Sequence, residues 1–330
     1  MTPREALFDA DDHAPALPVC DHYSGVEVRM RKSLELQAEL GPVFDVTLDC
    51  EDGAPVGGEL EHANLCAELV MSATNRFERV GARVHPVDHP AFEHDVDTLV
   101  RRAGSRLAYL MVPKPRGLAD VRRAIDEIDH FIRIHGHGRE IPVHVLVETH
   151  GALREVDAIA AHPRIESVSF GLMDFVSAHR GAIPASAMSA EGQFNHPLVR
   201  RAKLEIAAAC HAHGKAPSHC VVTEFKDLRA LSGAATRATR EFGYTRMWSI
   251  HPDQVRTIVD AFAPTVAETD LAIEIIRAAQ AAQWAPIRHR DTLHDRASYR
   301  YFWQVLERAR RTGQPLPAEV RQAWFDKAVA

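Results

Sequence analysis

The chain has 330 residues, of which 46% are hydrophobic and 25% are charged, a composition that can fill a large buried core. Its formal net charge of −6 gives no electrostatic reason to expect nucleic acid or an anionic membrane as a partner. The five cysteines form no CxxC pair, which favours reduced thiols over a disulfide framework. The chain does not open on an apolar signal-like segment and has no apolar run of about 18 residues, so we expect a cytoplasmic protein that is not inserted in a membrane.

Short segments rich in Val, Ile and Leu alternate with longer segments of helical periodicity from about residue 16 to residue 263. This alternation is typical of repeated βα units around a parallel sheet. The predicted strands are 16–20, 43–49, 80–85, 107–112, 141–148, 165–171, 216–222 and 245–250. Helices are expected between them, among others over 58–77, 118–134, 197–213 and 224–242.

Eight strands in roughly 250 residues predict a TIM (β/α)8 barrel, which we assign to residues 1–264. The alternative is a doubly wound open sheet, which would need a glycine-rich phosphate turn after its first strand. The glycines at 57–58 and at 136 and 138 do not form a G-x-G-x-x-G segment followed by a helix, so the barrel is preferred.

After Pro264 the alternation ends, and residues 265–330 are predicted to form a helical C-terminal extension. A helix is expected over Val266–Gln283, followed by a polar segment, Asp291–Arg311, that carries four aromatic residues: Tyr299, Tyr301, Phe302 and Trp303. These rings need a surface to bury against, either the barrel of the same chain or a neighbouring subunit. We expect the second arrangement, and therefore a homo-oligomer.

Charged or ionisable residues stand at the carboxyl ends of six of the eight predicted strands. They are Asp49, Glu51 and Asp52 after the second strand, Arg83 and His85 in the third, Lys114 after the fourth, Glu148 at the end of the fifth, Asp174 after the sixth and His251 after the eighth. Buried charges are unfavourable unless they are paired or bind a metal, and barrel enzymes carry their active sites at this end of the strands. The sequence therefore predicts one active-site rim.

Glu148 and Asp174 offer only oxygen ligands, with no nearby cysteine or paired histidines, which suits Mg²⁺, with Mn²⁺ as an alternative ion. Both carboxylates also precede possible helix starts, where they could act as caps instead. Arg83 could bind a substrate carboxylate with two parallel hydrogen bonds, or form a structural salt bridge to Glu51 or Asp52. Lys114 is a catalytic candidate, as a Schiff-base lysine or, preferably, in an electrostatic role. His85, His89 and His94 lack the spacing of metal ligands.

Six motifs in this order resemble the HpcH/HpaI aldolase and citrate lyase β-subunit superfamily, which includes malyl-CoA lyases. The motifs are Asp49-x-Glu51-Asp52-Gly53-Ala54-Pro55, Gly81-Ala82-Arg83-Val84, Val112-Pro113-Lys114, Glu148-Thr149, Gly171-Leu172-Met173-Asp174 and Ile250-His251-Pro252-Asp253-Gln254, over about residues 40–262. The resemblance implies a TIM barrel in which Glu148 and Asp174 bind Mg²⁺ and Arg83 contacts the substrate. By the same likeness, Asp49, Glu51 and Asp52 order Arg83 and the metal-bound water.

Three segments depart from the family pattern. Leu17 to Gly25 stands where members often carry Ser-x-Leu-x-x-Pro-Gly, a difference that bears on coenzyme A binding. His85 replaces the usual Asn after Arg-Val, and Asp49-Cys50-Glu51-Asp52 replaces Asp-Leu-Glu-Asp. We therefore expect substrate choice to differ within the family.

The resemblance implies a Mg²⁺-dependent carbon–carbon lyase of citrate lyase β-subunit or malyl-CoA lyase type, acting on a 3-hydroxyacyl-CoA-like substrate through an enolate. One alternative is a pyruvate-type aldolase that cleaves 4-hydroxy-2-oxo acids without coenzyme A. Another is a non-catalytic accessory barrel that keeps the metal site. The expected partner is a small 2-hydroxy or 2-oxo acid or an acyl-CoA, and the expected assembly is a trimer or hexamer.

Overall fold

The computed structural model describes residues 2–9 and 15–326, which form two compact units. One unit is Leu17–Ala261, and the other joins the N-terminal residues up to 16 to the C-terminal residues from Phe262. We assigned residues 1–16 to the barrel domain, whereas the structure groups them with the C-terminal helices. Residues 1, 10–14 and 327–330 of the predicted domains lie outside the described residues.

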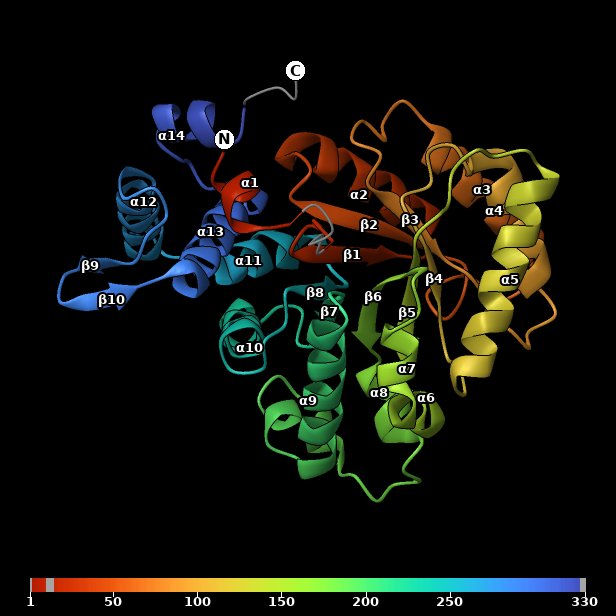
Figure 1. The fold of residues 1–330 in the computed structure, drawn as a ribbon. Helices are drawn as coiled ribbons and strands as arrows, with labels where there is room; N and C mark the ends of the chain where they lie inside the picture. The colour runs from red at the N-terminus through yellow and green to blue at the C-terminus, as the bar shows by residue number, and fades with distance from the viewer. Residues whose placement is uncertain (1, 10–14, 327–330) are drawn as a thin grey trace. The chain divides into compact units, whose positions relative to one another are not determined.

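The first unit is a closed barrel of eight parallel strands in sequential order, with β1 paired to both β2 and β8 (Figure 1). Its strands are β1 (Cys20–Ser24), β2 (Phe44–Asp49), β3 (Val80–Arg83), β4 (Leu110–Val112), β5 (Val143–Val147), β6 (Ile165–Phe170), β7 (Ala216–His219) and β8 (Arg246–Ser249). The predicted TIM barrel is therefore confirmed.

Helices follow the strands and cover the outside of the barrel. They are α2 (Glu27–Leu40), α3 (Glu59–Met71), α4 (Phe92–Ala103), α5 (Leu118–Ile134), α6 (His150–Arg154), α7 (Val156–Ala160), α8 (Leu172–Ser177), α9 (Pro197–Ala212), α10 (Leu228–Arg240) and α11 (Pro252–Phe262), with 3-10 turns η1 (Ala185–Met188) and η2 (Gly192–Phe194). Helices α3, α4 and α5 lie side by side along one flank (Figure 1). This flank follows β2, β3 and β4, which supply Asp49, Arg83 and Lys114 to the rim.

Several predicted boundaries were wrong, among them the end of the helix predicted over 58–77, which the structure places at Met71. The first strand is Cys20–Ser24 rather than 16–20, because its register pairs Cys20 with Phe44 and the preceding segment contains prolines, which cannot donate to a strand ladder. Helix α10 starts at Leu228 rather than near 224, because the Asp227 carboxylate accepts hydrogen bonds from the backbone N–H groups of Arg229 and Ala230 and caps the helix there.

The barrel interior contains a buried charged network beneath the rim. The Arg246 guanidinium, on β8, lies 2.8 Å from Asp45 Oδ2 and 3.5 Å from Asp21 Oδ2. Thr47 and Tyr109 donate to Asp21 Oδ1 over 2.6 Å and 3.0 Å. These pairings offset part of the unfavourable burial of the two carboxylates, and burial still raises the pKa of Asp45 to about 7.

The second unit contains α1 (Pro3–Leu7), α12 (Val266–Ala281), the hairpin of β9 (Ile287–His289) and β10 (Thr292–His294), α13 (Arg296–Arg311) and α14 (Ala318–Trp324). The hairpin overlaps the start of the predicted polar segment Asp291–Arg311, where no strand was predicted. Its turn residues Arg290 and Asp291 both have positive φ angles, 46° and 63°, as the tight turn of a two-residue hairpin requires.

The aromatic residues of α13 find most of their burial within this unit. Tyr299 and Trp303 are buried in a core with Leu7 and Trp324, and the Trp303 ring stacks on Phe325 with centroids 4.9 Å apart. The reasoning that all four rings need a neighbouring subunit is therefore wrong for Tyr299 and Trp303. Of the four, only Tyr301 is largely exposed, at 54%. The homo-oligomer stays a prediction.

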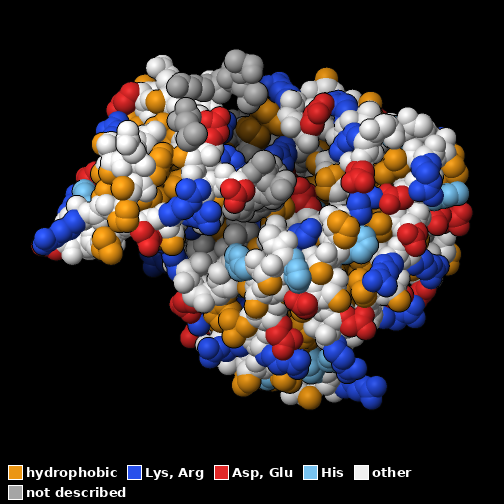
Figure 2. Space-filling view, in the orientation of Figure 1, with side chains coloured by type: hydrophobic (Ala, Val, Ile, Leu, Met, Phe, Trp, Pro, Cys, Tyr) orange, Lys and Arg blue, Asp and Glu red, His pale blue; other side chains and the backbone are white. Residues whose placement is uncertain are grey.

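The surface of the barrel unit mixes both signs of charge. On the face that Figure 2 shows, acidic, basic and hydrophobic side chains are interspersed. No helix among the described residues combines the length and apolar character needed to cross a bilayer.

Candidate functional site

Arg83, at the end of β3, is held by the acidic residues that end the neighbouring strand β2. Its Nε and one Nη donate to the two oxygens of the Asp49 carboxylate, each over 2.7 Å. The other Nη lies 2.9 Å from Glu51 Oε2. An arginine has five N–H donors, so three are committed and two remain. Arg83 is only 6% exposed, and the fork to Asp49 fixes the plane of its guanidinium.

Asp49 is itself fixed by the loop that follows it. The backbone N–H groups of Glu51 and Gly53 donate to its two carboxylate oxygens, over 2.9 Å and 2.7 Å. Gly53 is required there, because a Cβ at this position would lie 2.3 Å from Asp49 Oδ2. The Asp49-x-Glu51-Asp52-Gly53 segment is therefore a local cradle that orients Arg83.

An aromatic stack lies against the guanidinium on its other side. Arg83 Cζ lies 4.5 Å from the centroid of the Tyr23 ring on β1, and Tyr23 stacks on Trp248 of β8 with centroids 4.7 Å apart. Trp248 also packs with Met111 and Leu146. Guanidinium groups stack favourably on aromatic faces, so Tyr23 restricts Arg83 to one plane.

Lys114, just after β4, joins the acidic cluster. Its ammonium contacts the Glu51 carboxylate and lies 2.7 Å from Asp52 Oδ2 and 3.9 Å from Asp174 Oδ1. Burial alone would lower the pKa of Lys114, but its hydrogen bonds to Asp52 and Glu51 outweigh this effect and raise the pKa above its ordinary value. A protonated amine is not a nucleophile, so this environment favours the electrostatic role over the Schiff-base role.

The Lys114 backbone also reaches the neighbouring strand end. Its φ angle is 50°, which is uncommon for a residue with a side chain, and its N–H donates to Glu148 Oε1 over 2.8 Å. Strained backbone of this kind concentrates at functional sites. The unusual conformation thus provides one of the contacts that hold Glu148 in place.

Glu148, at the end of β5, is 2% exposed. Gly171 packs directly against it, since a Cβ on that glycine would lie 2.4 Å from Glu148 Oε2. Burial, reinforced by the nearby Asp174 carboxylate, raises the pKa of Glu148 to about 8. Asp174 lies in the first turn of α8 and its side chain is 45% exposed. The rim thus presents one buried and one accessible carboxylate close together.

The structure brings together all seven residues that the sequence nominated: Asp49, Glu51, Asp52, Arg83, Lys114, Glu148 and Asp174. The alternative that Glu148 caps a helix does not hold, because the cap of α6 is Thr149, which accepts from the Ala152 N–H. The alternative for Arg83, a salt bridge to Glu51, is present, alongside the pairing with Asp49.

The histidines near the rim bind protein groups. His85 Nδ1 lies 2.6 Å from Asp95 Oδ2, the His89 ring stacks on His85, and His94 Nε2 lies 3.2 Å from the Thr98 hydroxyl. His251 Nδ1 accepts from the Asp253 N–H at the start of α11.

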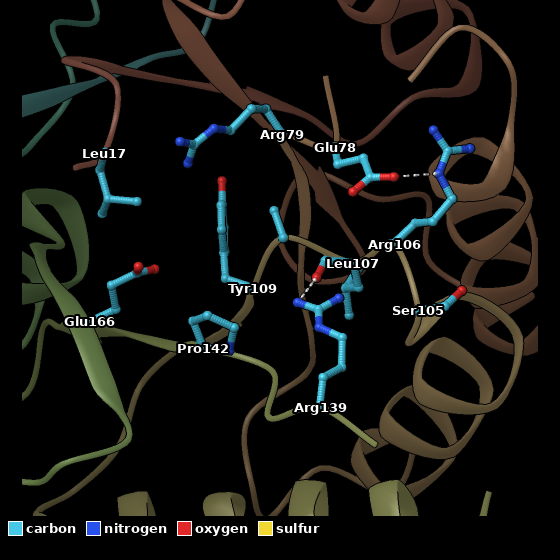
Figure 3. Close-up of a pocket in the computed structure, with 11 residues that line it drawn as sticks. Leu17, Glu78, Arg79, Ser105, Arg106, Leu107, Tyr109, Arg139, Pro142 and Glu166 are labelled. Carbon is cyan, nitrogen blue, oxygen red and sulfur yellow. Dashed lines mark hydrogen bonds and ion pairs between the residues drawn. The ribbon is translucent and has the colours of Figure 1, made fainter. Parts of the chain in front are cut away.

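A separate cavity of about 400 Å³ lies at the opposite, amino-terminal ends of the strands (Figure 3). Two of its arginines donate to backbone carbonyls: Arg139 to those of Gly104 and Leu107, and Arg106 to those of Met71 and Ser72. In Figure 3, Arg139 points toward Leu107 and Arg106 toward Glu78. This end of a barrel serves stability rather than catalysis.

Sequence reasoning missed Tyr23, Trp248 and Gly171. Tyr23 and Trp248 lie on the first and eighth strands, which become neighbours only when the barrel closes. Gly171 belongs to a motif that the sequence did single out, but its role as the surface against which Glu148 packs depends on the pairing of β5 with β6.

Comparison with known proteins agrees with this geometry. The family model for HpcH/HpaI aldolase/citrate lyase matches residues 46–252. An L-malyl-CoA/β-methylmalyl-CoA lyase from Cereibacter sphaeroides is 28% identical over 248 residues, which cover 72% of this chain and 77% of the relative. A (3S)-malyl-CoA thioesterase from the same species is 24% identical over 72% of this chain and 75% of its own.

Solved structures resemble the whole chain. A citrate lyase from Burkholderia xenovorans is 55% identical, covers 98% of this chain and 99% of its own, and superposes with a TM-score of 0.85. Mycobacterium tuberculosis CitE, solved with magnesium, acetoacetate and coenzyme A, shares the fold at 20% identity, with a TM-score of 0.68 over 91% of this chain and 99% of its own. The barrel, the rim and the extent of the family match together show that the chain belongs to the HpcH/HpaI aldolase/citrate lyase family of carbon–carbon lyases.

Proposed function

We propose that the protein is a Mg²⁺-dependent carbon–carbon lyase that cleaves, or in reverse forms, a 3-hydroxyacyl-CoA thioester carrying a carboxylate. The observation that carries the proposal is the pair of carboxylates, Glu148 and Asp174, next to the fixed guanidinium of Arg83 on one barrel rim. This arrangement combines a site for a hard cation with a preorganised cationic donor.

The donor set fits Mg²⁺. Glu148 is a buried carboxylate whose pKa is raised by its surroundings, and the nearest ammonium, that of Lys114, is already paired with Glu51 and Asp52. A divalent cation held by Glu148 and Asp174 would balance their charge, and Mg²⁺ commonly binds through one or two carboxylates with water and substrate oxygens. When bound, the cation would polarise the substrate's oxygen atoms as a Lewis acid.

Arg83 would bind the substrate through its two uncommitted N–H groups. Asp49, Glu51 and Tyr23 hold the guanidinium before substrate arrives, so little reorganisation is needed as negative charge develops. In the cleavage direction a water molecule takes the hydroxyl proton, the electrons of that O–H bond form a carbonyl, and those of the broken C–C bond pass to the thioester fragment as an enolate, which then takes up a proton from water to give the acyl-CoA product. The fixed guanidinium stabilises this redistribution of charge.

Lys114 would position the acidic cluster. Its ammonium ties Glu51 to Asp52 and lies near Asp174, while its N–H holds Glu148. It thereby links the residues that orient Arg83 to the residues that would hold the cation. Loss of this link should weaken metal affinity and activity together.

The use of a CoA thioester is supported by the relatives, whose names describe action on malyl-CoA and β-methylmalyl-CoA. A second candidate is the aldolase without coenzyme A, which the first strand favours. At the segment that departs from the family pattern, this chain places Tyr23 stacked on Trp248 beside Arg83. Rings at this position change the shape available to a substrate.

The test is an assay of the full chain with Mg²⁺ on two substrates, malyl-CoA and a 4-hydroxy-2-oxo acid. A lyase acting on malyl-CoA releases glyoxylate and keeps the thioester, whereas a thioesterase releases the free thiol of coenzyme A, so the aldehyde and thiol products are measured separately. We expect glyoxylate without thiol, and loss of the reaction in EDTA. Release of thiol alone, cleavage of the oxo acid only, or an unchanged rate in EDTA would contradict the proposal.

We also propose a homo-oligomer, a trimer or hexamer, that associates through the C-terminal unit. Its exposed apolar side chains support this: Val266 and Leu293 are each 73% exposed and Tyr301 is 54% exposed. Light scattering of the full chain should give a multiple of 36.7 kDa, and Leu293→Asp should lower it. A monomer mass for the unmodified chain would contradict the proposal.

A further inference from the structure

Three side chains with nitrogen and sulfur ligand atoms gather behind the cradle of Arg83. Cys50 directly follows β2, and His62 and Cys66 lie one turn apart on the same face of α3. One ligand atom from each of the three lies within 4.8 Å of the others. The Cys50 and Cys66 sulfur atoms are 3.6 Å apart.

These distances match tetrahedral coordination by soft ligands. With Zn–S bonds of about 2.3 Å, two thiolates on a tetrahedral ion lie about 3.8 Å apart. The observed sulfur–sulfur separation of 3.6 Å is therefore close to what zinc would need.

The backbone engages one ring nitrogen of His62 and leaves the other available. Its Nε2 lies 2.8 Å from the Asp49 carbonyl oxygen, which can only accept, so Nε2 carries the proton and Nδ1 keeps a free lone pair in the neutral ring. Histidines that bind metals usually donate their second N–H to a backbone carbonyl or a carboxylate in this way.

We propose that Cys50, His62 and Cys66 form a binding site for one soft divalent cation, with Zn²⁺ as the natural ligand. The site is separate in chemistry from Glu148 and Asp174, which offer only oxygen. Three protein ligands leave one coordination position for water. His62 is partly exposed, whereas both cysteines are buried, so the ion would enter past the imidazole.

The two thiols differ in their electrostatics. Hydrogen bonds with Cys50 and His62 lower the pKa of Cys66 to about 7 against the opposing effect of burial. The hydrogen bond to Cys66 and burial raise the pKa of Cys50 well above its ordinary value, so a bound cation would have to displace the proton of Cys50. A thiol must lose its proton to bind zinc, and a lowered pKa reduces the energy that this step requires.

A bound cation would tie α3 to the strand end that carries Asp49. Cys50 also donates its N–H to the Arg83 carbonyl over 2.9 Å, so the site touches β2, β3 and α3 at once. The ion would therefore stabilise the segment that positions Arg83 without contacting substrate. This inference does not depend on the identity of the reaction.

The test uses Co²⁺ as a spectroscopic probe in the full chain, reduced with a phosphine. Thiolate ligation gives a strong sulfur-to-cobalt charge-transfer band and intense tetrahedral d–d bands, whereas cobalt on Glu148 and Asp174 would give only weak bands of oxygen ligation. We expect one tetrahedral Co²⁺ per chain, displaced by one equivalent of Zn²⁺. Absence of a charge-transfer band would overturn the proposal.

Variants assign the site. Cys66→Ser should weaken the charge-transfer band. His62→Gln, at a partly exposed position, should lower cobalt affinity by about tenfold to 100-fold, the range for changes around a metal site. Cys210→Ser, which removes a buried cysteine from α9, is the matched control and should leave both unchanged. Circular dichroism confirms that each variant folds. A band that survives Cys66→Ser, or an affinity unchanged in His62→Gln, would overturn the assignment.

Discussion

Replacing Arg83 by lysine tests the proposed role of its guanidinium. Arg83 commits three N–H donors to Asp49 and Glu51 and leaves two for substrate. A lysine ammonium keeps the positive charge next to Asp49, so that carboxylate is not left buried and unpaired. It has no planar fork, however, and cannot hold Asp49 with two parallel bonds while facing a substrate carboxylate. The fold should survive and catalysis should suffer.

The expected loss follows from the donors that disappear. Removal of one preorganised donor from an active site weakens transition-state stabilisation by about 2–4 kcal/mol. At about 1.4 kcal/mol per factor of ten, kcat/KM should fall roughly 30-fold to 700-fold. The stack on Tyr23 is also lost, because an ammonium does not match the ring face as a planar guanidinium does.

Steady-state kinetics on malyl-CoA with saturating Mg²⁺, together with thermal unfolding, separate catalysis from folding. Arg101→Lys is the matched control, because Arg101 pairs with Asp97 on the surface of α4, with its side chain 49% exposed, and surface pairs contribute little. The control should keep its activity. Near-normal kcat/KM in Arg83→Lys, with an unchanged Tm, would refute the role of Arg83.

Four further outcomes are expected. Glu148→Gln should abolish Mg²⁺-dependent activity yet raise the Tm of the metal-free protein at neutral pH. Folding raises the pKa of the Glu148 carboxyl to about 8, so the folded protein loses stability as the pH rises from the ordinary pKa of a glutamate toward that value. A lower Tm for the variant would contradict this. Gly171→Ala should weaken Mg²⁺ affinity, measured by activity titration, since its Cβ would lie 2.4 Å from Glu148 Oε2, while Gly233→Ala, with open space around its Cβ, should not. Trp303→Ala should destabilise the C-terminal unit by about 3–5 kcal/mol in denaturant unfolding, and a change below about 1 kcal/mol would show that its burial matters little. Burial lowers the pKa of Lys203 from 10.5 to about 8, so the folded chain binds fewer protons than the unfolded chain between pH 8 and pH 10.5. Over that range, the stability of the unmodified protein should rise with pH relative to that of Lys203→Met. A difference in stability between the two proteins that does not change with pH would argue against the shift.

The strand-end pattern of the sequence was sufficient to nominate the rim residues. Arg83, Glu148 and Asp174 each follow an apolar run, and parallel strands deliver their carboxyl ends to one side of a barrel. Chain order and hydrophobic period determine this much, since both are local properties. The first strand was misplaced because its apolar residues start before its backbone pairing does.

Other features depend on contacts between distant residues. The stack of Tyr23 on Trp248 requires the closure of β1 onto β8, and the burial of Tyr299 and Trp303 requires α1, from the other end of the chain. The orientation of Lys114 rests on a positive φ angle that no propensity indicates. The Cys50, His62 and Cys66 cluster joins a strand end to a helix that the sequence separates by a loop.

The sequence by itself determined the barrel, the family and the chemical types of the residues on its rim, because periodicity, element order and motif spacing are written along the chain. Only the tertiary structure decided which of those residues hold one another. It assigned Asp49 and Glu51 to Arg83, Lys114 to the acidic cluster and the N-terminal segment to the C-terminal unit. The physical reason is that a side chain's pairing, burial and pKa depend on the groups that folding brings within a few ångströms, and these come from strands and helices far apart in the sequence.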